Sequence, residues 1–148
     1  FYDSMLVQSE DKNIFSKKNF RIVSKKKPNK SQFDDLIFAF NVCRYVKSNA
    51  IVLASNKSTV GIGSGQPSRL DSCKIAIDKM NKFIKNKNEI VAASDAFFPF
   101  IDGIEKLIQS GVTAVIQPSG SIRDKEIINF ANSTETILIF SKTRHFRH

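Results

Sequence analysis

The sequence has no run of 18 apolar residues, and this absence excludes a transmembrane helix. Its first residues, Phe1–Met5, have neither the basic start nor the apolar centre of a signal peptide. It also lacks an initiator methionine, so we expect the 148 residues to be a piece of a longer, cytoplasmic polypeptide. This length is enough for one domain with a sizeable core.

Cysteine and histidine are scarce, with two of each. Cys43 and Cys73 each lie within an apolar helical pattern, which favours buried free thiols in a reducing compartment over a disulfide or a metal pair. His145 and His148 fall in the last four residues, and we expect them to be frayed surface side chains. No H-x-E motif accompanies a C-x-x-C motif, which excludes a zinc deaminase site, and no metal is expected in catalysis.

Two nucleotide-binding motifs are missing as well. No G-x-x-x-x-G-K-[S/T] motif occurs, so a P-loop ATPase is excluded. The third glycine of a G-x-G-x-x-G motif would fall on Gln66, so the dinucleotide fingerprint is excluded too.

Acidic residues are the minority, 14 against 23 basic ones, and the net charge is +9. Such a surplus attracts polyanions in general. The densest basic run, Lys25–Lys27, precedes Pro28 in a predicted loop, and we interpret it as a solvated surface. No nucleic-acid partner is therefore expected, although a basic nucleic-acid-binding module remains one alternative and an inactive fragment the other.

Apolar periodicity predicts an α/β fold. Alternating and continuous apolar runs predict strands over 5–8, 19–23, 50–54, 59–62, 90–93, 112–117 and 136–140. Helical spacing predicts helices over 32–47, 69–85, from 99 to a stop at 111, and over 124–132. Ser31 with Asp34 predicts a capping box for the first helix, and 86–88 should end the second. From residue 90 onward strands alternate with helices, which predicts parallel βαβ units buried on both faces.

The stretch Gly61–Arg69 lies between a predicted strand and a predicted helix. Its three alternate glycines allow a close backbone approach, and Ser68 with Asp71 could cap the helix. Arg69 would suit an anion at the helix N-terminus, where free N–H groups converge. A plain tight turn between strand and helix explains the glycines equally well.

The stretch Ser94–Asp102 crowds three phenylalanines between two acids. We expect Phe98 and Phe100 to fill the core and Asp95 to cap the following helix, while Phe97 could instead stack on a flat ligand. Ligands of open parallel sheets bind beyond the carboxyl ends of the strands. We therefore expect one crevice lined by four loops, namely 61–69, 94–100, 118–121 and the tail from 141.

Six segments in order resemble one family. They are Leu6–Gln8, Val46–Val52, Gly61–Arg69, Ser94–Phe100, Gln117–Ser121 and Arg144–His148. Together they make the chain resemble the C-terminal part of AICAR formyltransferase/IMP cyclohydrolase, a bifunctional enzyme of purine biosynthesis. The resemblance implies formyl transfer from 10-formyltetrahydrofolate, the co-substrate, to the 5-amino group of AICAR.

The resemblance also implies a cytidine deaminase-like three-layer fold with a mixed, partly parallel sheet, forming the second subdomain of a formyltransferase domain. Residues 1–30 would be a linking edge segment and 31–148 the subdomain. It implies a homodimer with sites at the subunit interface. The sequence leaves open whether a structural potassium ion lies near Asp95.

Site residues follow from the resemblance position by position. AICAR would contact Asn49 near the transferred formyl group, Arg69, Phe97 and, through its phosphate, Arg144. The folate would contact Leu70, Asp102, Ser121 and Ile122. Asn49 is the single residue here with an implied catalytic role.

The chain departs from the family pattern at two places. Ile101 stands where family members often carry arginine. The family's adjacent lysine-histidine pair, which assists proton transfer, lies upstream of the resembling region, and no Lys-His dipeptide occurs here. Loss of general acid–base help typically costs on the order of 10²–10⁴-fold in rate. We therefore expect little or no formyltransferase activity from these residues alone.

Overall fold

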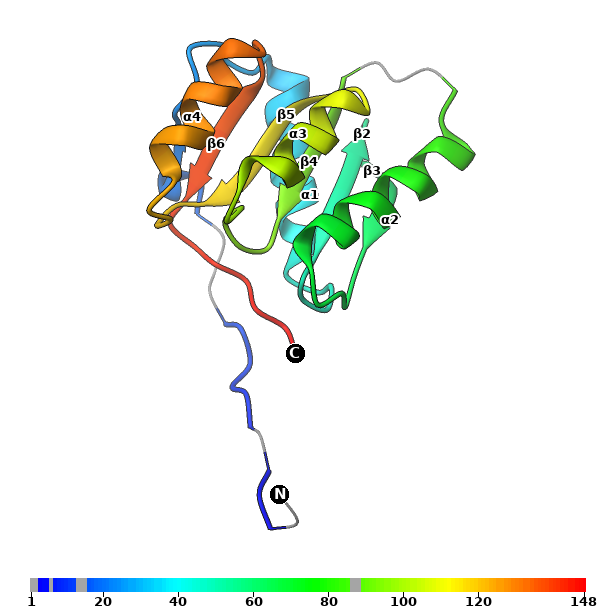
Figure 1. Ribbon diagram of the computed structural model, residues 1–148, viewed down its shortest axis with the longest axis vertical. Helices are drawn as coiled ribbons and strands as arrows, with labels where there is room; N and C mark the ends of the chain where they lie inside the picture. The colour runs from blue at the N-terminus through cyan, green and yellow to red at the C-terminus, as the bar shows by residue number, and fades with distance from the viewer. Residues whose placement is uncertain (1–2, 6, 13–15, 86–88) are drawn as a thin grey trace.

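A six-stranded mixed sheet forms the centre of the computed structural model, which describes residues 3–5, 7–12, 16–85 and 89–148 (Figure 1). The strands are β1 (Phe20–Ile22), β2 (Ile51–Ser55), β3 (Ser58–Gly63), β4 (Ile90–Ser94), β5 (Val112–Pro118) and β6 (Ile137–Ser141). The helices are the short 3-10 helix η1 (Lys17–Asn19), α1 (Lys30–Cys43), α2 (Arg69–Phe83), α3 (Ile101–Gln109) and α4 (Asp124–Ser133).

The strand order is β1-β6-β5-β4-β2-β3. Strands β4, β5 and β6 are parallel, as the alternation of strands and helices after residue 90 predicts. The other pairs, β1 with β6, β2 with β3 and β2 with β4, are antiparallel. The predicted mixed, partly parallel sheet is thus confirmed.

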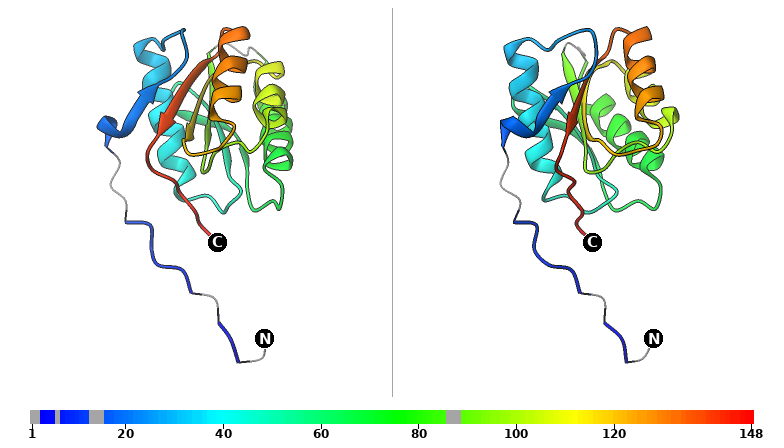
Figure 2. Two further views of the ribbon diagram at one scale, coloured as in Figure 1. Left: turned by 60° about the vertical axis from the view of Figure 1, so that its left-hand side comes forward. Right: turned by 90° about the vertical axis from the view of Figure 1, so that its left-hand side faces the viewer.

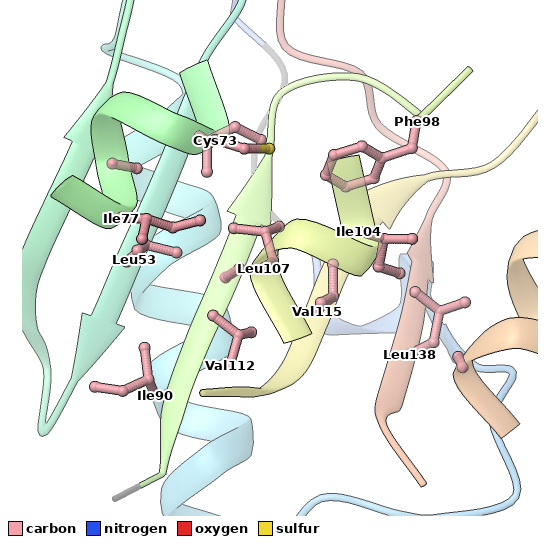
Figure 3. Close-up of a cluster of buried hydrophobic side chains, with 14 of the residues drawn as sticks. Leu53, Cys73, Ile77, Ile90, Phe98, Ile104, Leu107, Val112, Val115 and Leu138 are labelled. Atoms are coloured by element: carbon pink, nitrogen blue, oxygen red, sulfur yellow. The ribbon is translucent and has the colours of Figure 1, made fainter. Parts of the chain in front are cut away.

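Helices cover both faces of the sheet, which makes three layers. Figure 2 shows α1 on one side of the sheet and α2, α3 and α4 on the other. Alternate residues of each central strand serve the two faces: Val52 packs with α1, whereas Leu53 packs with α2 and α3. Figure 3 shows the core between the sheet and the helices α2 and α3, where Leu107 of α3 and Ile77 of α2 lie over side chains of the sheet. Burial of both faces explains why these strands are continuous apolar runs.

Both cysteines are buried free thiols, as predicted. Burial raises the pKa of the Cys43 thiol well above its usual range and raises the pKa of Cys73 to about 12. Both thiols are therefore protonated at neutral pH, and neither is a nucleophile there.

The first helix starts earlier than predicted and has a different cap. Asn29, not Ser31, is the N-cap: its side chain accepts a hydrogen bond from the Gln32 amide at 2.8 Å, and the Gln32 side chain accepts one from the Asn29 amide at 3.1 Å. Asp34, the predicted partner in the box, lies instead 3.5 Å from Lys57. The prediction of Ser31 with Asp34 was wrong because Asn29 and Gln32 form the same reciprocal motif two residues earlier.

The second helix begins at Arg69 with Ser68 as N-cap residue, but the Ser68 side chain makes no capping hydrogen bond. Asp71, its predicted partner, forms an exposed ion pair with Lys74 at 3.0 Å. The predicted end of this helix at 86–88 lies outside the described residues.

The hairpin of β2 and β3 turns through Asn56 and Lys57, both with positive φ, 51° and 54°. That geometry matches the two-residue turns favoured in hairpins. Asp35, buried in α1, accepts hydrogen bonds from both turn amides.

The predicted strand over 5–8 does not form at its described residues, Met5, Val7 and Gln8. The second predicted strand does form, as β1, which pairs with β6 at the edge of the sheet. The predicted boundary at residue 30 stays a prediction.

Candidate functional site

The carboxyl ends of the parallel strands lie at the same edge of the sheet as the start of β2 and the end of β3, that is, the edge formed by strand ends. This follows from the pairing directions, since β2 runs antiparallel to both β4 and β3. A cavity of about 470 Å³ opens at this edge. Its volume is within the range of small-molecule sites, roughly 300–1,000 Å³. Its lining comprises Asn49, Pro67–Leu70, Ala96–Phe100, Asp102, Gly103, Arg144 and Phe146.

Three of the four predicted loops line this cavity, and the loop over 118–121 does not. Six of the eight site residues that the resemblance implies are brought together, namely Asn49, Arg69, Leu70, Phe97, Asp102 and Arg144. Ser121 and Ile122 are outside this lining, and Ile122 is fully exposed. Their contact with folate stays a prediction.

A buried ion pair lies at the wall of the cavity. The Arg69 guanidinium donates to the Asp95 carboxylate, and both side chains are almost inaccessible to solvent. Arg69 also donates to Ser94 Oγ at 2.8 Å. The other carboxylate oxygen of Asp95 accepts from Ser48 Oγ at 2.5 Å. The predicted helix cap at Asp95 was therefore wrong, because this carboxylate balances a buried guanidinium instead.

Arg69 also orients Asn49. Its Nη2 donates to Asn49 Oδ1 at 2.8 Å, while Asn49 Nδ2 donates to the carbonyls of Gln66 and Pro67 at 2.9 and 3.1 Å. The Asn49 side chain therefore has a fixed amide orientation. An amide oxygen has two lone pairs, so Asn49 Oδ1 can accept one further hydrogen bond from a ligand.

The glycines of the Gly61–Arg69 stretch serve the packing of β3 on α2. A Cβ at Gly61 would lie 2.1 Å from the Ala76 carbonyl oxygen, and one at Gly63 would lie 1.9 Å from that of Ser72. Gly65 adopts φ +68°, in the left-handed region. The close approach that the sequence indicates is thus between strand and helix at the first two glycines, and a turn explains the third.

The loop over 94–100, the phenylalanine loop, places its three rings in different surroundings. Phe98 is buried in the core, as predicted, and its amide donates to Gln117 Oε1 at 3.2 Å. Phe100 is 52% exposed, so the prediction of a core ring was wrong there. Phe100 occupies the N-cap position of α3 and lies 4.9 Å from the Arg123 guanidinium carbon, in a cation–π arrangement. Phe97 is half-buried at the cavity, where a ring could stack on a flat ligand.

The C-terminal tail is ordered against the body of the protein. His145 is buried, with its ring 4.7 Å from that of Phe40, and its Nδ1 lies 2.6 Å from Asp11 Oδ2. The expectation of a frayed side chain was wrong for His145 because this position packs into the core. His148 is exposed. Arg144 is exposed at the cavity, with its guanidinium carbon 3.9 Å from the Phe146 ring centroid.

The basic run Lys25–Lys27 is exposed, as predicted. It follows β1, which is antiparallel to β6, and so lies at the opposite edge of the sheet from the cavity. This position separates the lysine run from the site.

Sequence reasoning missed the roles of Ser48 and Gln117. Ser48 bonds to Asp95 and, through backbone and side chain, to Arg147. Gln117 accepts a hydrogen bond from the Phe98 amide and so holds the middle of the loop over 94–100. Both lie within segments that carry the family resemblance, which was the only signal that could have marked them.

Comparison with known proteins decides the family. The family model described as AICARFT/IMPCHase bienzyme matches residues 1–79, more than half of the chain. The chain belongs to this family. Among its relatives, the bifunctional purine biosynthesis protein PurH of Buchnera aphidicola subsp. Baizongia pistaciae is 48% identical over 99% of the chain. PurH of Bartonella bacilliformis is 48% identical and PurH of Chlorobium chlorochromatii 45% identical, each over 97%. The chain spans 28% of the length of each of these AICARFT/IMPCHase relatives.

A solved structure supports the fold of this family member. The dCMP deaminase from the cyanophage S-TIM5 aligns with a TM-score of 0.50 at 15% identity, over 76% of this chain and 98% of that one. The predicted cytidine deaminase-like fold is thus confirmed. In the described part of the chain, no three His, Cys, Asp or Glu side chains are grouped to hold a metal ion. No helix of the described residues is long and apolar enough to cross a membrane.

A potassium ion near Asp95 remains a prediction. Arg69 and Ser48 already bond to the two carboxylate oxygens, and the guanidinium supplies the balancing charge. The residues at this carboxylate therefore fit a cation poorly, and we derive no step through one.

Proposed function

We propose that this chain forms one wall of a formyltransferase site that binds AICAR and 10-formyltetrahydrofolate. The observation that carries the proposal is the cavity, which gathers Asn49, Arg69, Leu70, Phe97, Asp102 and Arg144. The formyltransferase part of the bienzyme is favoured over the cyclohydrolase part because the resemblance implies a cytidine deaminase-like fold for the former. We further propose cytoplasmic purine biosynthesis by a homodimer whose sites lie at the subunit interface.

The residues divide the binding task by chemistry. The exposed Arg144 supplies positive charge for the AICAR phosphate, and the Phe97 ring offers a face for the flat imidazole. Asp102, in the first turn of α3, accepts from its own neighbour Gly103 at 2.7 Å and retains acceptor capacity for the folate ring. Leu70 adds apolar surface on the folate side.

Formyl transfer needs a bond from the AICAR amine nitrogen to the formyl carbon and the cleavage of the bond from that carbon to N10 of the folate. The amine loses a proton, and N10 gains one. Asn49 Oδ1, held by Arg69, can accept an N–H hydrogen bond and orient the amine. An amide oxygen is not a base, so the proton must go to another group, and the resemblance places that group in the upstream lysine-histidine pair.

The first prediction concerns Arg144. Isothermal titration should show that AICAR binds the wild-type chain about 10–100-fold more tightly than it binds Arg144→Ala, since a charge-assisted hydrogen bond contributes about 1.5–3 kcal/mol. Lys26→Ala removes the same charge at the opposite edge and should leave the affinity unchanged. Equal weakening by both variants would show a general polyanion surface and contradict the proposal.

The second prediction concerns turnover. The 148-residue chain, mixed with AICAR and 10-formyltetrahydrofolate, should bind but produce formylated AICAR at least about 100-fold more slowly than a full-length family member, since general acid–base help is missing. Product formation can be followed by the absorbance of the released tetrahydrofolate. A rate comparable to that of the full-length enzyme would show that proton transfer does not require the upstream pair.

A further inference from the structure

The C-terminal tail, residues 145–148, is held on one side by the body of the protein. The His145 amide donates to the Asp95 carbonyl at 3.0 Å. The Ser48 amide donates to the Arg147 carbonyl at 2.8 Å, and the Arg147 amide donates to Ser48 Oγ at 3.2 Å. Residues 145 and 147 therefore direct their backbone groups toward the loops beside the buried ion pair.

Backbone groups of Phe146 and His148 bond instead to the N-terminal arm, which we define as residues 7–12. The Gln8 amide donates through Nε2 to the Phe146 carbonyl and accepts through Oε1 from the His148 amide at 2.9 Å. One side chain thus bonds to two backbone groups on the side of the tail that faces away from the body, as a neighbouring strand would. Figures 1 and 2 show the N-terminal segment and the tail leaving the same edge of the sheet.

The arm is itself tied down a few residues later. Asp11 bonds to the buried His145 ring through its carboxylate and accepts from the Arg44 guanidinium through its backbone carbonyl. These contacts place the arm between the end of α1 and the tail. The tail residues 145–148 therefore run between two supports, one from the body and one from the arm.

Arg144 directly precedes this segment and stacks on Phe146, whose carbonyl accepts a hydrogen bond from Gln8. We propose that Gln8 is a positioning residue: by fixing the Phe146 backbone, it holds the ring on which the Arg144 guanidinium rests and directs that guanidinium to the cavity. The inference rests on the proposed function, in which Arg144 binds the AICAR phosphate. It also gives Gln8, which lies in a segment that carries the family resemblance, a role in the site.

The test compares two ligands, AICAR and the same nucleoside without its phosphate, by titration of the full 148-residue chain. The dissociation constant of the nucleoside divided by that of AICAR reports the contribution of the phosphate contact. A general loss of fold weakens both ligands and leaves this ratio unchanged. Gln8→Ala should lower this ratio about threefold to tenfold, the effect of one or two neutral hydrogen bonds. The urea midpoint of unfolding should not change, because Gln8 is exposed on an extended arm.

Val7→Ala is the matched control, since Val7 is the neighbouring residue and its side chain is 80% exposed. Val7→Ala should keep the wild-type ratio. Arg144→Ala should bring the ratio close to one, because the phosphate contact is lost. A wild-type ratio in Gln8→Ala, together with a ratio close to one in Arg144→Ala, would overturn this inference and leave the proposed function intact. A wild-type ratio in Arg144→Ala would overturn the phosphate role of Arg144 in the proposed function, and this inference with it.

Discussion

Asp95→Ala should lower the free energy of unfolding by about 3–5 kcal/mol, because it leaves the Arg69 guanidinium buried without its counter-charge. The side chains of Asp95 and Arg69 are 1% and 8% exposed, so water cannot replace the lost carboxylate. The change also removes the acceptor of Ser48 Oγ. Urea unfolding followed by far-ultraviolet circular dichroism measures the loss.

The matched control is Asp71→Ala, which removes the exposed ion pair with Lys74. Its side chain is 49% exposed, and such surface pairs contribute about 0–1 kcal/mol. A cost at Asp95 no larger than that at Asp71 would show that the Arg69 charge does not depend on this carboxylate.

Gly63→Ala should destabilise the protein by about 3 kcal/mol, the upper end of the usual cost of overpacking. The added methyl group would clash with three backbone atoms of Ser72, the carbonyl oxygen at 1.9 Å, the carbonyl carbon at 2.6 Å and Cα at 2.8 Å. Backbone atoms cannot rotate aside, so β3 must move away from α2. The same unfolding measurement applies.

Two neighbouring substitutions separate packing from conformation. Gly65→Ala has its nearest contact at 3.8 Å but a φ of +68°, so it should cost about 1–2 kcal/mol through backbone strain alone. Thr59→Ala, at an exposed position of β3, should cost less than about 1 kcal/mol. If Gly63→Ala costs no more than Thr59→Ala, the close contact of strand and helix is not required.

The regular elements were largely predictable, because apolar periodicity reports burial directly. The parallel order of β4 to β6 follows from alternating strands and helices, and the predicted strands 50–54 and 59–62 form the pair β2 and β3. The cap of α1 was misplaced because Ser31 and Asn29 are both good N-cap residues and local sequence does not choose between them.

The cavity brings together six of the eight residues that the resemblance implies, but the bonding among them could not be predicted. The resemblance implies Arg69 as a ligand contact, yet the structure uses its guanidinium on Asp95, Ser94 and Asn49. These partners are 20 to 26 residues away in sequence, and no local pattern reports such pairs. His145 was misjudged for the same reason, since its partners Asp11 and Phe40 are distant along the chain.

The central claim, that the cavity between α2, α3 and the tail binds AICAR, is tested most directly by mapping amide chemical shifts of the ¹⁵N-labelled chain during an AICAR titration. The account predicts that the largest changes occur at Asn49, Arg69, Phe97 and Arg144 and saturate with one dissociation constant. Changes centred on Lys25–Lys27, at the opposite edge of the sheet, or no saturable changes at all, would contradict it.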